Sequence, residues 1–242
     1  MDENKKNLIK VGVYLGALII LIVFFRLFGG NDNSDNVSNN KKATETVKEE
    51  TILSSVEKIS SKYYKSKVHV VLDDDAQTIE YEKKDNVLIG NKKYHNESIN
   101  FINYNENNYT YNEEEITRLD NFDYFDFDKT FVDLDNFKTL IKLDSVNNKY
   151  SFDGYEVYEF TYDMRDVLRV YNNINDTNYV TLERKDITLK VYSNNNKIEY
   201  MILDLTNVYN FINETELNEI SYKLTFEETK EEDTSWLIEK LK

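Results

Sequence analysis

An uninterrupted apolar segment near the N-terminus constrains this chain more than any other feature. The run Val11–Phe25 carries no charge and is bounded by Lys10 and Arg26. Because long basic side chains at helix ends can extend to the lipid headgroups, we count the segment as Leu8–Phe28. Its about 21 residues span roughly 31 Å, enough to cross the hydrocarbon core of a bilayer. The sequence therefore predicts a transmembrane anchor over residues 8–28, preceded by a short tail of residues 1–7.

A cleaved signal peptide is the alternative interpretation of the same segment. Signal peptidase needs small residues at its two recognition positions, and here Leu27 or Phe28 would occupy the outer one. The chain also has no Cys, so a lipid cannot be attached as it is in a bacterial lipoprotein. We therefore expect the anchor to be retained.

The flanking charges predict the orientation of the anchor. Lys5, Lys6 and Lys10 precede it, whereas no basic residue lies between Arg26 and Lys41. Cationic flanks are retained on the cytoplasmic side. We expect a single-pass protein of the cell membrane, with a cytoplasmic N-terminus and an extracytoplasmic C-terminal domain.

Charge and cysteine content limit what this domain can bind. The chain has 242 residues and a net charge of −15. Since residues 1–42 hold six Lys and Arg against four Asp and Glu, residues 43–242 carry −17. Such a domain is repelled by nucleic acid and by anionic lipid headgroups. The absence of Cys in an extracytoplasmic protein favours a bacterial envelope protein over a small animal ectodomain.

Periodicity divides the rest of the chain. Residues 29–43 are polar without a repeat and are typical of a flexible linker. Ile52, Val56 and Ile59 then recur at helical spacing, which predicts a helix that starts within 44–48 and ends at Lys62. We assign residues 44–242 to one extracytoplasmic α+β domain.

Alternation of apolar and polar residues predicts the strands, and a break in the first meander is expected at residues 91–93. Helices are expected over 133–144, 164–174 and 235–242. The strands are expected around residues 68–72, 79–81, 87–89, 99–104, 109–111, 155–162, 187–192, 198–206 and 220–227. The fold class is thus a transmembrane helix followed by an antiparallel sheet, or half-barrel, covered by helices.

The C-terminal hairpins carry a family resemblance. The run ITLKVYSNNNKIEYMILDLTN, followed by YKLTFEE, resembles the repeated hairpins of LolA/LppX-like lipoproteins. That resemblance covers about residues 48–228, counted from the order of helix, strand meander, inserted helices and further strands. It implies a half-open antiparallel barrel whose concave face is closed by helices and holds an acyl chain.

No catalytic motif accompanies this pattern. Only Gly90 and Gly154 lie outside the anchor region, so no phosphate-binding loop can be built. His69 and His95 lack metal-binding spacing, and His69 lies within a predicted strand. The acidic runs 73–75 and 120–128 lack the glycine and terminal glutamate of an EF-hand loop, and we interpret them as solvated. We therefore expect no enzymatic activity, no cofactor and no metal site.

Aromatic and aliphatic residues of the predicted strands are the candidate ligand site. One face of residues 198–206 should pack beneath helices, either Met201, Leu203 and Leu205 or Tyr200 and Ile202. Since both faces are apolar, we expect this strand to be covered on both sides. The candidate ligand-binding residues are Tyr158, Phe160, Tyr162, Tyr200, Met201, Leu203 and Tyr222.

Two functions remain open. The domain could bind a lipid-like ligand, which requires a continuous apolar cavity inside the sheet. Alternatively, it could be a scaffold or sensor that docks another envelope protein through its acidic surface. The second function predicts a filled core and an exposed apolar patch of more than a few hundred Å².

Overall fold

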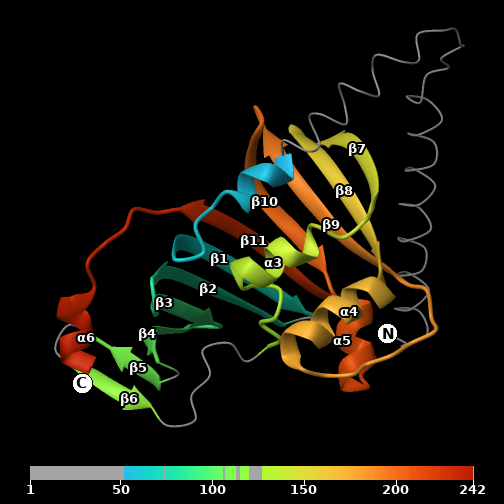
Figure 1. The fold of residues 1–242 in the computed structure, drawn as a ribbon. Coiled ribbons are helices and arrows are strands. Elements are labelled where there is room, and N and C mark those ends of the chain that lie inside the picture. The colour runs from blue at the N-terminus through green and yellow to red at the C-terminus, as the bar shows by residue number, and fades with distance from the viewer. Residues whose placement is uncertain (1–51, 74, 106, 113–114, 120–126, 242) are drawn as a thin grey trace, which may run out of the picture. The chain divides into compact units, whose positions relative to one another are not determined.

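The computed structural model describes residues 52–73, 75–105, 107–112, 115–119 and 127–241. They contain one antiparallel sheet of eleven strands in the order β6-β5-β4-β3-β2-β1-β11-β10-β9-β8-β7 (Figure 1). The strands are β1 (Tyr63–Leu72), β2 (Asp75–Lys84), β3 (Val87–Tyr94), β4 (Glu97–Tyr104), β5 (Asn107–Tyr111), β6 (Ile116–Leu119), β7 (Val146–Phe152), β8 (Tyr155–Asp163), β9 (Asp186–Asn194), β10 (Lys197–Asp204) and β11 (Ile220–Glu228). The helices are α3 (Leu134–Leu140), α4 (Met164–Asn175), α5 (Thr206–Asn213) and α6 (Ser235–Leu241), and residues 52–57 are also helical.

The antiparallel sheet and its helical cover confirm the predicted α+β domain. The predicted tail, anchor and linker, residues 1–7, 8–28 and 29–43, lie outside the described residues. Within the described part, no helix combines the length and the apolar character that crossing a membrane requires.

Residues that tolerate a left-handed backbone make the hairpin turns. Asn195 and Asn196 both have positive φ, 50° and 63°, as a two-residue type I′ turn requires. His95, with φ of 50°, lies between β3 and β4. The break expected at residues 91–93 is therefore wrong, because these residues pair with 98–100 inside the β3–β4 hairpin. Two consecutive lysines suggested a turn, but Lys92 is buried within the sheet.

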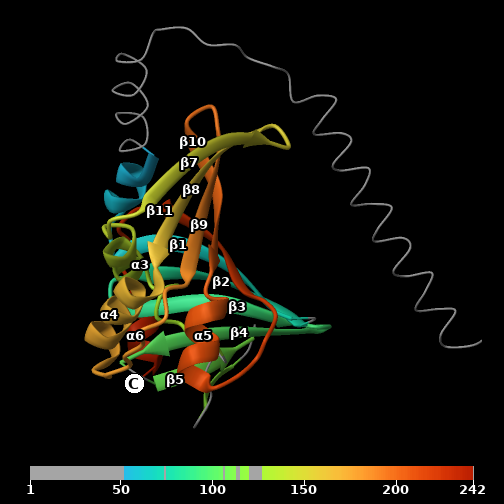
Figure 2. The ribbon, with the colours of Figure 1, turned by 90° about the vertical axis from the view of Figure 1, so that its right-hand side faces the viewer.

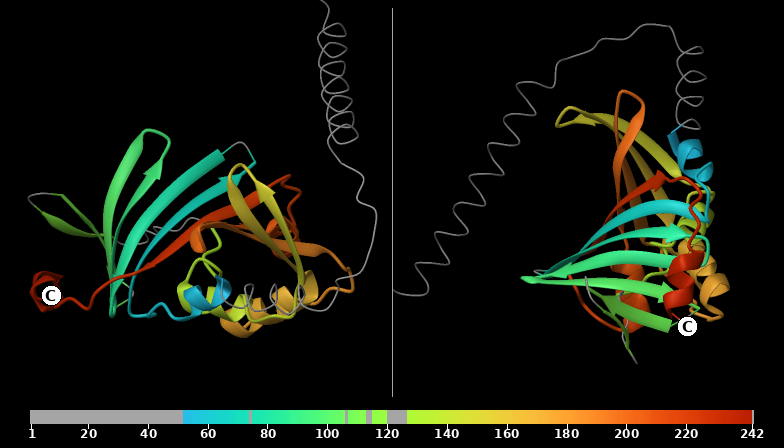
Figure 3. Two further views of the ribbon diagram at one scale, coloured as in Figure 1. Left: turned by 90° about the horizontal axis from the view of Figure 1, so that it is seen from above. Right: turned by 90° about the vertical axis from the view of Figure 1, so that its left-hand side faces the viewer.

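The two faces of the sheet carry different covers. We call the face packed against α3, α4 and α5 the inner face, and the opposite one the outer face (Figure 2). Phe101 and Ile102 are neighbours on β4, and both are buried. Phe101 belongs to the inner cluster, whereas Ile102 packs with Leu237 of α6. Figure 3 shows α6 beside the β4–β6 end of the sheet, apart from α3 and α4.

Aspartate side chains set the starts of two helices. The sequence left Asp133 and Asp135 as alternative N-caps of α3, and the structure assigns Asp133, which accepts hydrogen bonds from the amides of Asp135 and Asn136. Asp163 caps α4 through the amide of Arg165. The start of each of these two helices is thus encoded by a side chain that satisfies free amides of the first turn.

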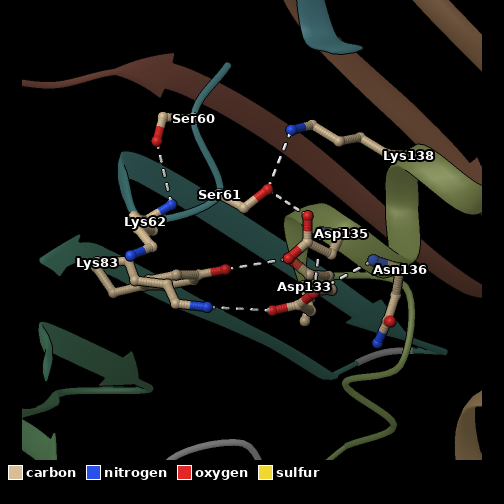
Figure 4. Close-up of polar contacts among 10 residues, drawn as sticks. Ser60, Ser61, Lys62, Lys83, Asp133, Asp135, Asn136 and Lys138 are labelled. Carbon is tan, nitrogen blue, oxygen red and sulfur yellow. Dashed lines mark hydrogen bonds and ion pairs between the residues drawn. The ribbon is translucent and has the colours of Figure 1, made fainter. Parts of the chain in front are cut away.

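Polar contacts also fix α3 to the segment before β1 (Figure 4). Lys138 donates to the carbonyl of Ile59 and, at 3.2 Å, to the hydroxyl of Ser61. Ser61 in turn donates to the carboxylate of Asp135. Lys83 of β2 lies 4.0 Å from the carboxylate of Asp133. The cover near α3 is therefore held by side-chain hydrogen bonds as well as by apolar packing.

Several elements differ from the sequence-based expectations. The first helix was expected to reach Lys62, but its described part ends at residue 57 and β1 begins at Tyr63. Strands β6 and β7 and helix α5 were not predicted. The residues expected to extend β10 instead begin α5, where the hydroxyl of Thr206 donates to Asp204 and Leu205 serves as N-cap. Leu205 continued the apolar alternation, so the sequence pattern concealed this change of direction.

Gly90 generates a test of the packing on the inner face. A Cβ at this position would lie 2.5 Å from Cζ of Phe101, 2.6 Å from the carbonyl oxygen of Glu80 and 2.8 Å from Cβ of Tyr81. We expect Gly90→Ala to lower the free energy of unfolding by about 1–3 kcal/mol through overpacking. Urea denaturation would measure this loss of stability.

Phe101→Leu provides the coupled control, because it removes the ring atom nearest to the added methyl. The double variant should lose less stability than the sum of the two single changes. Additive losses, or a Gly90→Ala variant as stable as the wild type, would contradict this account of the contact.

Candidate functional site

Six of the seven predicted ligand-binding residues meet in one buried layer on the inner face. Paired residues form a row across the sheet. Phe160 pairs with Leu189, Leu189 pairs with Leu203, and Leu203 pairs with Tyr222. None of the six side chains is more than 4% exposed. The six are Tyr158, Phe160, Tyr162, Met201, Leu203 and Tyr222. Of the two alternatives for β10, Met201 and Leu203 therefore lie beneath the helices.

Tyr200, the seventh residue, lies on the outer face. Its ring stacks on Tyr192 with a centroid separation of 4.4 Å, and Nζ of Lys223 lies 3.8 Å from its centroid. Tyr200 and Ile202 are only half-buried. The expectation that β10 is covered on both sides holds fully for the inner side only, because on the outer side neighbouring side chains leave the strand half-buried.

A small cavity lies between the inner layer and its helical cover. Its volume is about 10 Å³. Such a cavity has room for about one water molecule. In this conformation the cavity is therefore too small to hold an acyl chain. The lining residues are Asp128, Phe131, Tyr171, Leu205, Val208, Tyr209, Ile212 and Tyr222.

Helix α5 and its N-cap supply four of these lining residues. None of the four was among the candidate ligand-binding residues, although Leu205 belonged to one alternative for the face beneath the helices. Val208 and Ile212 are four positions apart, which places them on one side of a helix. This helical spacing could have predicted α5, but Leu205, which comes just before the helix, continued the alternation expected of a strand. Tyr222 is the one predicted site residue that lines the cavity.

Tyrosine hydroxyls tie the segment before α3 to the sheet. Tyr222 donates to the carbonyl of Asp128 at 3.1 Å, and Tyr81 donates to that of Val132 at 3.0 Å. The hydroxyl of Tyr162 is buried without a partner among the described residues. Burial raises the pKa of Tyr162 and that of Tyr222, so both phenols stay protonated at neutral pH. Both buried phenols therefore carry no charge there.

Helix α5 is held differently from α3. Asn207 donates to the carbonyl of Asp186 at 3.1 Å. The other side-chain hydrogen bonds described for α5 stay within residues 204–220, such as those between Asn210 and Leu217. Only Val208 of α5 is fully buried. Apolar packing thus supplies most of the contact between α5 and the rest of the inner layer.

The residues considered for metal binding have structural partners instead. Nδ1 of His69 lies 2.9 Å from the hydroxyl oxygen of Thr78 on the neighbouring strand. Asp73 accepts from the amides of Asn218 and Glu219, which joins its turn to the loop before β11. Of the second acidic run, residues 120–126 lie outside the described part. The described residues contain no group of three His, Asp or Glu that could hold a metal ion.

Two larger hollows open on the surface, and most of the residues that line them are charged or polar. One, of about 460 Å³, lies over outer-face residues of β1–β3 that include the ion pair Lys67–Glu80. The other, of about 360 Å³, lies between α4 and residues 177–181 and is lined by Arg165 and Arg169. Both arginines are engaged with aspartates, Asp163 and Asp166. Neither hollow offers the apolar enclosure that a lipid-like ligand needs.

Two solved structures align with most of this chain at low sequence identity. No protein-family model matches the chain. No curated protein matches it either. Among solved structures, LprF from Mycobacterium bovis aligns with TM-score 0.43 and 10% identity, covering 75% of this chain and 92% of LprF. The lipoprotein LppX from Mycobacterium tuberculosis aligns with TM-score 0.38 and 9% identity, covering 76% and 94% of the two chains.

Proposed function

We propose that this chain is a non-catalytic binding protein of the bacterial cell envelope, and that its ligand is lipid-like. The observation that carries the proposal is the apolar cavity beneath α5, which the inner layer and the helix enclose together. Its walls are aliphatic side chains and aromatic rings, with neutral hydroxyls at Tyr222 and Tyr171 and a carboxylate at Asp128. Such a lining accepts a hydrocarbon chain and can bind one polar end.

Displacement of α5 would open this cavity. About ten methylenes of an acyl chain gain roughly 8 kcal/mol on burial. Exposing Val208, the one fully buried side chain of α5, costs about 1.5–3 kcal/mol. Leu205, Tyr209 and Ile212 would lose part of their packing, but the ligand would cover the same surfaces. The balance therefore favours a bound state in which α5 lies farther from Tyr222.

Val208→Ala tests the position of the ligand. The change removes part of the wall, so a fluorescent fatty acid should bind more tightly than to the wild type because α5 has to move less. The measurement is a fluorescence titration of the chain that begins at Ala43, with the probe at micromolar concentration. The stability of each variant is measured alongside, and a loss of about 2 kcal/mol is expected from the lost packing.

Val87→Ala is the matched control, because Val87 is an equally buried valine in the cluster beneath α6 on the outer face. It should lose comparable stability and leave probe binding unchanged. If both variants alter binding alike, the ligand does not lie beneath α5. If the wild-type chain neither retains lipid on purification nor binds the probe, the lipid-binding function itself is wrong.

We propose further that residues 8–28 anchor the chain in the cell membrane and that residues 44–242 lie outside. The uncharged run and the cationic flank Lys5, Lys6 and Lys10 support this arrangement. A reporter that is active only outside the cytoplasm should work when fused after Lys242. A reporter that is active only in the cytoplasm should fail at the same position, and the reverse pair of results would contradict the orientation.

Docking of another envelope protein is the second candidate function. It is favoured by the small volume of the cavity beneath α5 and by the net charge of −17 on residues 43–242. Half-buried aromatic side chains on the outer face, Tyr155 and Tyr200, would add apolar contact. Absence of lipid binding in the titration above would favour this function.

A further inference from the structure

Strand β7 is an edge of the sheet with few of the features that prevent edge pairing (Figure 1). Proteins usually protect such edges with proline, bulges, short strands or outward-pointing charges. The chain has no Pro, and the seven residues of β7 pair with β8 without a register shift. Its one charged side chain, Lys149, turns back onto β8. There Nζ lies 3.2 Å from Glu156 and 4.8 Å from the ring centroid of Tyr158.

The ends of β7 expose two large apolar side chains. Val146 is 72% exposed and Phe152 is 60% exposed. Side chains at an even spacing lie on one face of a strand, so both residues point to the outer face, together with Tyr150. The outer face of β7 thus carries Val146, Tyr150 and Phe152, with Asn148 between them, beside a backbone edge that pairs with no other described strand.

We propose that β7 is a self-association surface, on which a second copy of this chain adds its own β7 in antiparallel orientation. A twofold axis at Lys149 would place Val146 of each copy opposite Phe152 of the other. Asn147 would face Ser151, and Asn148 would face Tyr150. The two most exposed apolar side chains of the strand would then cover each other, which is the self-complementarity that a twofold interface requires.

The backbone agrees with this register. Oδ1 of Asn148 accepts from the amide of Lys149 at 2.9 Å, which places this donor on the side away from β8. Amides two residues apart point the same way in a strand, so those of Asn147 and Ser151 share this side. These three residues face one another in the proposed pairing, where their amides and carbonyls can form a ladder.

Charge and length define the strength of the pairing. β7 contains no carboxylate, although the chain carries −15, so the strand itself adds no negative charge to the contact between two copies. The two Lys149 side chains would lie opposite each other, but each has Glu156 as partner in its own copy. A strand of seven residues is about 23 Å long, too short to bury the roughly 1,200–2,000 Å² typical of a stable complex. The dimer is therefore weak and depends on concentration.

Single cysteines test the register directly, because the full chain has none of its own. Lys149→Cys places the two thiols opposite each other, at a Cα separation of about 5.5 Å that suits a disulfide. It should form a disulfide-linked dimer much faster than Ser151→Cys, whose copies would lie about 13 Å apart along the strands. Leu182→Cys, at a residue 94% exposed outside β7, gives the rate of disulfide crosslinking by random collision. Crosslinking of Lys149→Cys no faster than Leu182→Cys would overturn the proposal.

Charge substitutions test the affinity without a new covalent bond. Phe152→Lys should weaken dimerisation of the full chain by about tenfold, measured by sedimentation velocity. The change removes both symmetric Val146–Phe152 pairs and places added positive charge on each copy. Leu182→Lys makes the same kind of change outside β7 and should leave association unchanged. Lys149→Gln should strengthen it by removing the opposed cations. If Phe152→Lys behaves like Leu182→Lys, or the chain stays monomeric throughout, β7 is not the association surface.

Discussion

The burial of one apolar layer between the sheet and α3–α5 supports the rest of this structure. Aromatic and aliphatic side chains from β8, β10 and β11 form its floor, and α4, α5 and the segment before α3 cover it. Tyr222 shows how closely the two sides depend on each other. Its ring lies 5.6 Å from that of Phe127, and its hydroxyl donates to Asp128. The sheet alone would expose this layer to water, so the helices are necessary to the fold.

The same layer supports the proposal of an apolar ligand. Phenols in a dry environment remain neutral, because burial raises the pKa of Tyr162 and Tyr222. Tyr222, which lines the cavity, is therefore suited to contact an apolar molecule rather than to transfer a proton. The small cavity volume means that binding depends on the movement of its cover. α3 is fastened by hydrogen bonds, whereas α5 depends mainly on packing.

An open sheet has a second consequence, at its edges. Covering one face with helices buries the layer but leaves the backbone of the last strand available. On the outer face, α6 covers only the cluster near β3–β6, and the apolar residues of β7 remain exposed. Ligand binding on the inner face and self-association at the edge would therefore use separate surfaces of one sheet.

The sequence by itself determined the elements whose residues follow a clear period or a clear cap. Alternation predicted most strands, and the helix that Asp133 caps was expected because its cap and partners are local in the chain. Alternation along β8 and β11 also marked Tyr158, Phe160, Tyr162 and Tyr222, which the structure buries on one face. Only the tertiary structure decided which face of β10 meets the helices, because both faces are apolar. It likewise revealed α5, whose helical spacing was concealed by the strand-like Leu205, and the edge position of β7, which depends on pairing between distant residues.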